Sequence, residues 1–225
     1  MARFISSIGQ ITGKLGGVVF KRRGNKTYVS KAPGHLKPTN DPATKQRRKK
    51  FAWVGKFTKA VNASPLLNAL WKPSSSKSVS VFNKIFKEVF NSTDSHDLSG
   101  TPVFTPCAPF ALKSKSVLFG KSSIFVEAGP PVLGSDIDLV KEISVIAVGV
   151  MILSDPVNES YPEDLFLPVQ SGKLPLPLIG TSNFIIPLEN RDMLYYDYYR
   201  TKKACIVLVT LDLSGNPIHY SATIS

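Results

Sequence analysis

The chain has 225 residues, of which 43% are hydrophobic and 20% charged, a composition that excludes wholesale disorder. Its formal net charge of +12 is unevenly spread, because residues 1–100 hold 19 basic and four acidic residues and residues 101–225 hold nine and 12. This asymmetry predicts a polyanionic partner for the first half, which is nucleic acid, an acidic protein surface or anionic lipid. The alternative is a solubilising basic tail.

The N-terminal 40 residues combine glycine with β-forming residues. Residues 1–12 are expected to form an irregular arm. Residues 18–20 and 27–29 flank the pair Gly24-Asn25, which predicts a short β-hairpin. An isolated hairpin is only marginally stable in water, so we expect this one to dock on a later part of the chain or on a neighbouring molecule. Residues 31–40 predict an extended link.

A basic helix is predicted next, with Asp41 as its N-cap, Pro42 at its first position and its end near Asn62. Its apolar stripe contains Phe51, Trp53, Val54, Phe57, Thr58, Ala60 and Val61. Its first turns are cationic, which opposes the helix dipole and favours a binding role over a stabilising one. With the hairpin turn, the candidate residues for binding nucleic acid or a neighbouring subunit are Lys21, Arg22, Arg23, Lys26, Lys45, Arg47, Arg48, Lys49 and Lys50.

Two shorter helices, at 65–71 and 79–90, complete a helical segment spanning 41–92. A polar stretch at 92–100 marks a domain boundary. Turn signals then separate strand candidates at 102–106, 116–119, 123–128, 143–153, 164–169, 182–188, 204–213 and 217–224. Short strands at this spacing predict an antiparallel, immunoglobulin-like β-sandwich over 101–225 that folds by itself. The predicted fold class is therefore α+β: a basic arm and hairpin (1–40), about three helices (41–92) and the sandwich.

Four tyrosines, Tyr195, Tyr196, Tyr198 and Tyr199, precede the last predicted hairpin. They are expected to pack at the sandwich edge, with an exposed recognition patch as the alternative. The widely separated Cys107 and Cys205 indicate a reducing compartment, and whether they pair stays open. The longest apolar run, 143–153, is too short to span a bilayer, so we expect no membrane association.

The sequence contains no recognisable catalytic constellation. The histidines His35, His96 and His219 are far apart, and none has a partner at metal-ligand spacing. The acidic residues Asp136, Asp138 and Glu142 lack the glycine and the final glutamate of a calcium loop. The expectation is a protein without enzymatic activity, metal or cofactor.

The opening of the chain follows a familiar order. It reads Gly-Lys-Leu-Gly-Gly-Val-Val-Phe from Gly13, Gly-Asn-Lys-Thr-Tyr-Val from Gly24, and Asn-Asp-Pro-Ala-Thr from Asn40, followed by Arg47 or Arg48, Phe51 and a closing Trp71. This order resembles the N-terminal part of uncharacterised proteins from Bacteroidota and their phages. The resemblance covers residues 13–72 and none of the β-rich half, and it implies a phage or mobile-element setting.

These observations together predict a virion structural protein, a capsid, neck or tail component assembled in the host cytoplasm. Its partners would be other virion subunits and packaged DNA, contacted without sequence preference, and it would be oligomeric within the assembly. Two alternatives remain open, a cellular sequence-neutral nucleic-acid-binding protein and a host interaction module that binds no nucleic acid.

Overall fold

The computed structural model describes residues 2–4, 12–34, 41–73, 79–94, 100–106, 109–132, 137–178 and 180–225. Internal contacts divide the chain into two compact units, Met1–Thr44 and Lys45–Ser225. We call the second unit the body. The described residues form four helices and antiparallel sheets, so the predicted α+β class is confirmed.

The first unit is a four-stranded antiparallel sheet with the order β1-β4-β3-β2. Its strands are β1 (Ala2–Phe4), β2 (Gly13–Leu15), β3 (Val18–Arg23) and β4 (Lys26–Lys31). The turns β2–β3 and β3–β4 each begin with a glycine at positive φ, Gly16 at 55° and Gly24 at 62°. The predicted hairpin is therefore confirmed as β3–β4.

The expectation of a lone hairpin is wrong, because β1 and β2 pair with its two outer edges. The prediction of an irregular arm is also wrong for residues 2–4, which form β1, while residues 5–11 lie outside the described part of the chain. Three or more strands form a more stable sheet than two, so the unit does not depend on docking a single hairpin.

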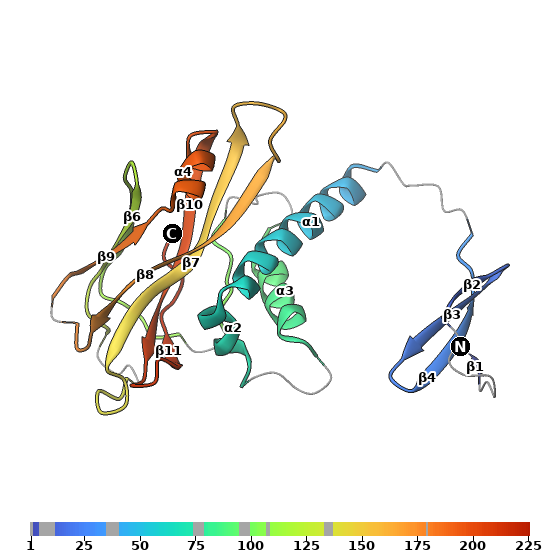
Figure 1. Ribbon diagram of the computed structural model, residues 1–225, viewed down its shortest axis with the longest axis horizontal. Coiled ribbons are helices and arrows are strands. Elements are labelled where there is room, and N and C mark those ends of the chain that lie inside the picture. Colours follow the sequence, from blue (N-terminus) through green and yellow to red (C-terminus); the bar gives the residue numbers. More distant parts are fainter. Residues whose placement is uncertain are drawn as a thin grey trace. The chain divides into compact units, whose positions relative to one another are not determined.

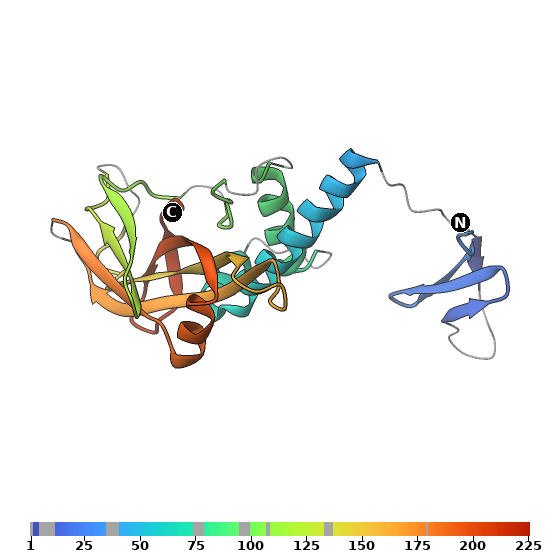
Figure 2. The same cartoon turned by 90° about the horizontal axis from the view of Figure 1, so that it is seen from above.

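The body has three layers (Figures 1 and 2). The central sheet has the order β11-β10-β7-β8, formed by β7 (Ser144–Pro156), β8 (Asp164–Pro175), β10 (Tyr199–Leu211) and β11 (Pro217–Tyr220). A second sheet has the order β5-β6-β9, with β5 (Lys115–Phe119), β6 (Ser123–Ala128) and β9 (Ser182–Pro187). Helices α1 (Pro42–Ala63), α2 (Pro65–Trp71) and α3 (Val81–Ser92) lie on the opposite side of the central sheet.

Strands β7 and β10 explain why the apolar run at 143–153 is continuous. Even-numbered residues of β7, such as Val148 and Val150, belong to the core shared with the helices. Odd-numbered residues, such as Ala147 and Met151, belong to the core shared with the second sheet. A strand buried on both faces has no polar face, so its sequence does not alternate.

The helices therefore belong to the same compact unit as the sheets. This division differs from the sequence-based boundary at 92–100, because α1–α3 supply half of one of the two hydrophobic cores. Trp53, Phe57 and Trp71 are buried against central-sheet residues, and the Trp71 indole N–H donates to the Phe104 carbonyl at 3.0 Å. Without the helices, one face of the central sheet would be exposed to water.

Several predicted details are corrected. Residues 102–106 are not a strand; Pro102 and Pro106 cannot donate ladder hydrogen bonds, and Phe104 instead packs on Phe57. Phe51, predicted on the buried stripe, is 60% exposed and packs on the α3 rings. The last predicted strand ends at Tyr220 rather than at residue 224, with isolated bridges beyond it.

A short helix, α4 (Asn190–Tyr196), was not predicted and carries part of the tyrosine cluster. Tyr196 and Tyr199 are buried, and their hydroxyls donate to the carbonyls of Gly120 and Pro162. Tyr198 is 40% exposed and stacks on Tyr161, with ring centroids 4.7 Å apart. The packing interpretation is thus confirmed for the two buried tyrosines.

The close approach of β7 and β10 at Gly149 gives a test of the central register. A Cβ at this position would lie 2.0 Å from the Cys205 carbonyl oxygen, and shifting the backbone to relieve the clash costs free energy. We expect Gly149→Ala to lower the free energy of unfolding by about 3 kcal/mol or more. The control Gly172→Ala, in β8 with open space around the new Cβ, should be neutral or stabilise by up to about 1 kcal/mol. Urea unfolding followed by circular dichroism measures both, and equal stabilities would contradict the register.

Candidate nucleic-acid interface

The N-terminal sheet gathers cations on one of its faces. Residues that pair across an antiparallel ladder share a face, and residues two apart on a strand do as well. The register pairs Lys14 with Val19, Lys21 with Tyr28, and Arg23 with Lys26. These pairs place Lys14, Lys21, Arg23 and Lys26, all exposed, on the same side as Tyr28. We call these four cations the basic face.

The opposite side of the sheet is largely apolar. It carries Leu15, Val18, Phe20 and Val29, which we call the apolar face, with Arg22 and Lys31 toward its ends. Arg22, predicted to act with its neighbours, is therefore on the other side, and its Nε–H donates to the Gly24 carbonyl at 2.8 Å. Lys14 was missed by the sequence reasoning. The signal was the Gly16-Gly17 turn, which folds Lys14 back beside β3.

The sheet holds no anion of its own. Residues 1–40 contain no Asp or Glu, so cations of this segment cannot be neutralised within it. The described residues also show no ion pair for any member of the basic face. Four exposed cations on one side of a small sheet therefore form a site that favours an external polyanion.

The basic run of α1 is divided by the fold. The helix starts as predicted, with the Thr44 N–H donating to the Asp41 carboxylate at 3.1 Å. Lys45, Arg47 and Arg48 are exposed and have no ion pair within the described chain. These three residues lie on more than one side of the helix, so one flat surface cannot contact all three.

Lys49 and Lys50 instead contact other residues of the body. The Lys49 ammonium contacts Glu163 Oε1 at 2.5 Å, and this hydrogen bond raises the pKa of Lys49. Both side chains are more than half exposed, so the pair stabilises the fold by only about 0–1 kcal/mol. The Lys50 ammonium lies 4.2 Å from the Phe90 ring centroid. These contacts leave Lys45, Arg47 and Arg48 as the available cations of the run.

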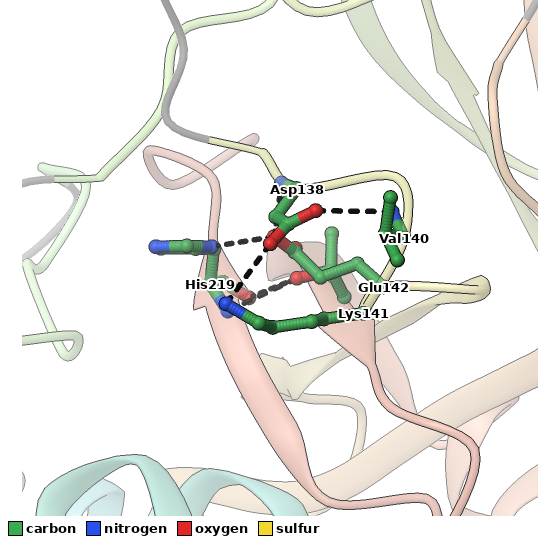
Figure 3. Close-up of polar contacts among 6 residues, drawn as sticks. Asp138, Val140, Lys141, Glu142 and His219 are labelled. Atoms are coloured by element: carbon green, nitrogen blue, oxygen red, sulfur yellow. Dashed lines mark hydrogen bonds and ion pairs between the residues drawn. The ribbon is translucent and has the colours of Figure 1, made fainter.

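A polar cluster of Asp138, Lys141, Glu142 and His219 lies where the chain enters β7 (Figure 3). The fully buried Glu142 accepts from the Asp138 N–H at 2.7 Å, and its Oε1 lies 2.9 Å from His219 Nδ1. Asp138 pairs with Lys141 across a surface turn, and the resulting hydrogen bond lowers the pKa of Asp138. These contacts hold the turn before β7 against strand β11, so we assign the cluster a structural role.

A pocket of about 470 Å³ lies between the α1–α2 junction, β8 and the segment around Glu189, and its described lining residues include no histidine, lysine or cysteine. No group of three or more potential metal ligands occurs among the residues that the structure describes. Burial raises the pKa of the Cys205 thiol to about 12, which leaves almost no thiolate at neutral pH.

The remaining sequence predictions fall on segments without a description. Cys107, His35, His96 and Asp136 lie outside the described residues. Within the described segments, no helix is both long enough and apolar enough to cross a membrane.

The Glu142 contacts can be tested by substitution. Glu142→Ala would leave the Asp138 N–H without its acceptor and remove the tie to His219, so we expect a loss of about 1–3 kcal/mol in the free energy of unfolding. The neighbouring Lys141→Ala removes a side chain that is 75% exposed and should change it by less than about 0.5 kcal/mol. Thermal unfolding of the two variants compares them directly. Equal stabilities would show that the cluster does not hold the turn.

Comparison with known proteins adds little to this geometry. No family model matches the chain, and no curated protein matches it. One solved structure that it matches is DesR, a β-glucosidase from Streptomyces venezuelae in complex with D-glucose, at 10% sequence identity and a TM-score of 0.25. The match covers 52% of this chain and 15% of the glucosidase.

Proposed function

We propose that the chain is a non-enzymatic structural component of a bacteriophage particle, in the capsid, neck or tail. In this proposal the body is the rigid part, and the basic N-terminal region attaches it to neighbouring subunits, to packaged DNA or to both. The protein would be assembled into the particle in the host cytoplasm and would be oligomeric there. The resemblance of residues 13–72 to proteins of Bacteroidota and their phages supports the phage setting.

The observation that carries the proposal is the separation of charge from the hydrophobic core. The available cations lie on a small sheet without acidic residues and on the exposed first turns of α1. The two hydrophobic cores lie in the body. A surface on which exposed Lys and Arg side chains gather binds anions through charge. This arrangement suits attachment better than catalysis.

We further propose that the two sheets of the body form an immunoglobulin-like sandwich. Seven strands divide into sheets of four and three, as in constant-type domains. Strand β6 pairs with β9, and β7 pairs with β10, across intervening segments that cross between the sheets. Strand β8 pairs with β7 instead of β9, which is a departure from the constant-type order. The helical layer on the central sheet is an addition to such a domain.

Electron cryo-microscopy of the native assembly tests the proposed class. We expect purified phage particles to contain the chain, with density for the body repeated by the symmetry of the particle. Mass spectrometry of the same preparation gives its copy number relative to the other subunits. If the chain is found in infected or host cells but never in purified particles, the proposal fails. The cellular nucleic-acid-binding protein would then replace it.

A matched pair of variants tests attachment through α1. Arg47→Gln with Arg48→Gln removes two available cations, and Lys56→Gln with Lys59→Gln removes two exposed cations further along the same helix. The first pair should reduce incorporation into particles at least several-fold, and the second should leave it near normal. Both should fold normally, because the replaced side chains are exposed. Equal incorporation of the two variants would mean that the basic run is only a solvated surface.

The same two variants distinguish a nucleic-acid partner from an acidic protein partner. If the run meets nucleic acid, removing two phosphate contacts should flatten the plot of log affinity against log salt by about 1.4–1.8 units. If the run meets an acidic subunit surface, incorporation falls while the salt dependence of nucleic-acid binding by the free chain hardly changes. Fluorescence anisotropy over a salt series provides this measurement.

A further inference from the structure

The cations of the basic face repel one another. Arg23 and Lys26 are directly opposed across β3 and β4, and like charges in this position destabilise a sheet. Lys21 precedes Arg23 by two residues, about 6.7 Å along the strand. These separations are shorter than the Debye length of about 8 Å at physiological salt, so their potentials add. Folding stability does not account for this placement, whereas binding of a polyanion does.

The position of Tyr28 narrows the choice of polyanion. Tyr28 lies directly opposite Lys21 and two residues from Lys26, on β4, which has a neighbouring strand on each side. Its side chain is partly exposed, on the same side as the four cations. An aromatic ring within a cationic sheet surface offers a base a platform for stacking while the cations meet the phosphates.

Other polyanions use this arrangement less well. Base faces are stacked inside a duplex, so duplex DNA leaves the tyrosine without a partner. An acidic protein surface supplies charge but has no need of a ring at the centre. A membrane would favour several apolar side chains next to the cations, whereas the described register places one aliphatic residue, Val19, among them and places Leu15, Val18 and Phe20 on the opposite face.

We propose that the basic face of the N-terminal sheet binds single-stranded nucleic acid, with phosphates on Lys14, Lys21, Arg23 and Lys26 and a base stacked on Tyr28. The proposal rests on the attachment role given above to the N-terminal region. It adds single-stranded nucleic acid as the partner, the basic face as the site and base stacking as the role of Tyr28.

The test uses the full chain and a labelled 12-nucleotide single strand of mixed sequence, with the duplex of the same length as a second probe. The variant Lys21→Gln with Lys26→Gln removes one cation from each central strand on the basic face. The control Arg22→Gln with Lys31→Gln removes one cation from each of the same strands on the apolar face. Net charge is therefore equal in the two proteins, and only the face differs.

We expect the basic-face variant to flatten the salt dependence of single-strand affinity by about 1.4 units, and the control to change it little. Tyr28→Leu should weaken single-strand binding about tenfold and leave duplex binding unchanged, because only the single strand can stack on the ring. Circular dichroism of each variant checks that the fold is intact. Equal losses in the two double variants would overturn the choice of face.

Two further outcomes would also overturn the proposal. One is a Tyr28→Leu variant that binds the single strand as well as the unmodified chain does. The other is displacement of the oligonucleotide by poly-L-glutamate at equal charge concentration, which would indicate an acidic protein partner. Particle incorporation is measured separately. If incorporation is normal but binding shows no preference for a face, only this inference fails; if binding is face-specific but particles lack the chain, only the proposed virion role fails.

Discussion

The body depends on the pairing of β7 with β10. These two strands run antiparallel over their whole lengths, and both of their faces are buried over residues 145–153 of β7 and 204–211 of β10. Gly149 allows the backbones to approach where any side chain would meet the Cys205 carbonyl. Because the pair is apolar on both sides, it requires a covering layer on each side. Helices α1–α3 supply one layer and the sheet β5-β6-β9 supplies the other.

The N-terminal sheet is held together differently from the body. Its described side chains are mostly exposed or partly exposed, and Thr27 is buried, so little apolar area is removed from water. Backbone pairing between four strands holds it together, and its two faces have opposite character. One face is largely apolar, and the other concentrates charge that no residue of 1–40 can neutralise. Charge of this kind is an unfavourable feature of the isolated sheet and a favourable one once an anion is bound.

The cations of the basic face and of the basic run of α1 thus divide into two groups. Lys49 and Lys50 contact Glu163 and Phe90, and these contacts belong to the packing of the body. The basic face and the first turns of α1 have no such contacts within the described chain. This division explains why the local density of Lys and Arg overstates the number of cations available to a partner. Exposure and pairing, rather than position in the run, separate the available cations from the structural ones.

The sequence by itself determined the fold class, the three helices, most of the strands and the location of the charge. Local signals carry that information: Asp41-Pro42 begins a helix, Gly24-Asn25 turns a hairpin, and a run such as 143–153 marks a buried strand. Tertiary structure decided that the helices cover the sheet, because that depends on contacts between distant segments, such as that of Phe57 in α1 with Phe166 in β8. It also decided which cations share a face. Lys14 joins Lys21 only through the β2–β3 register, and Arg22 is directed away by the two-residue period of its own strand.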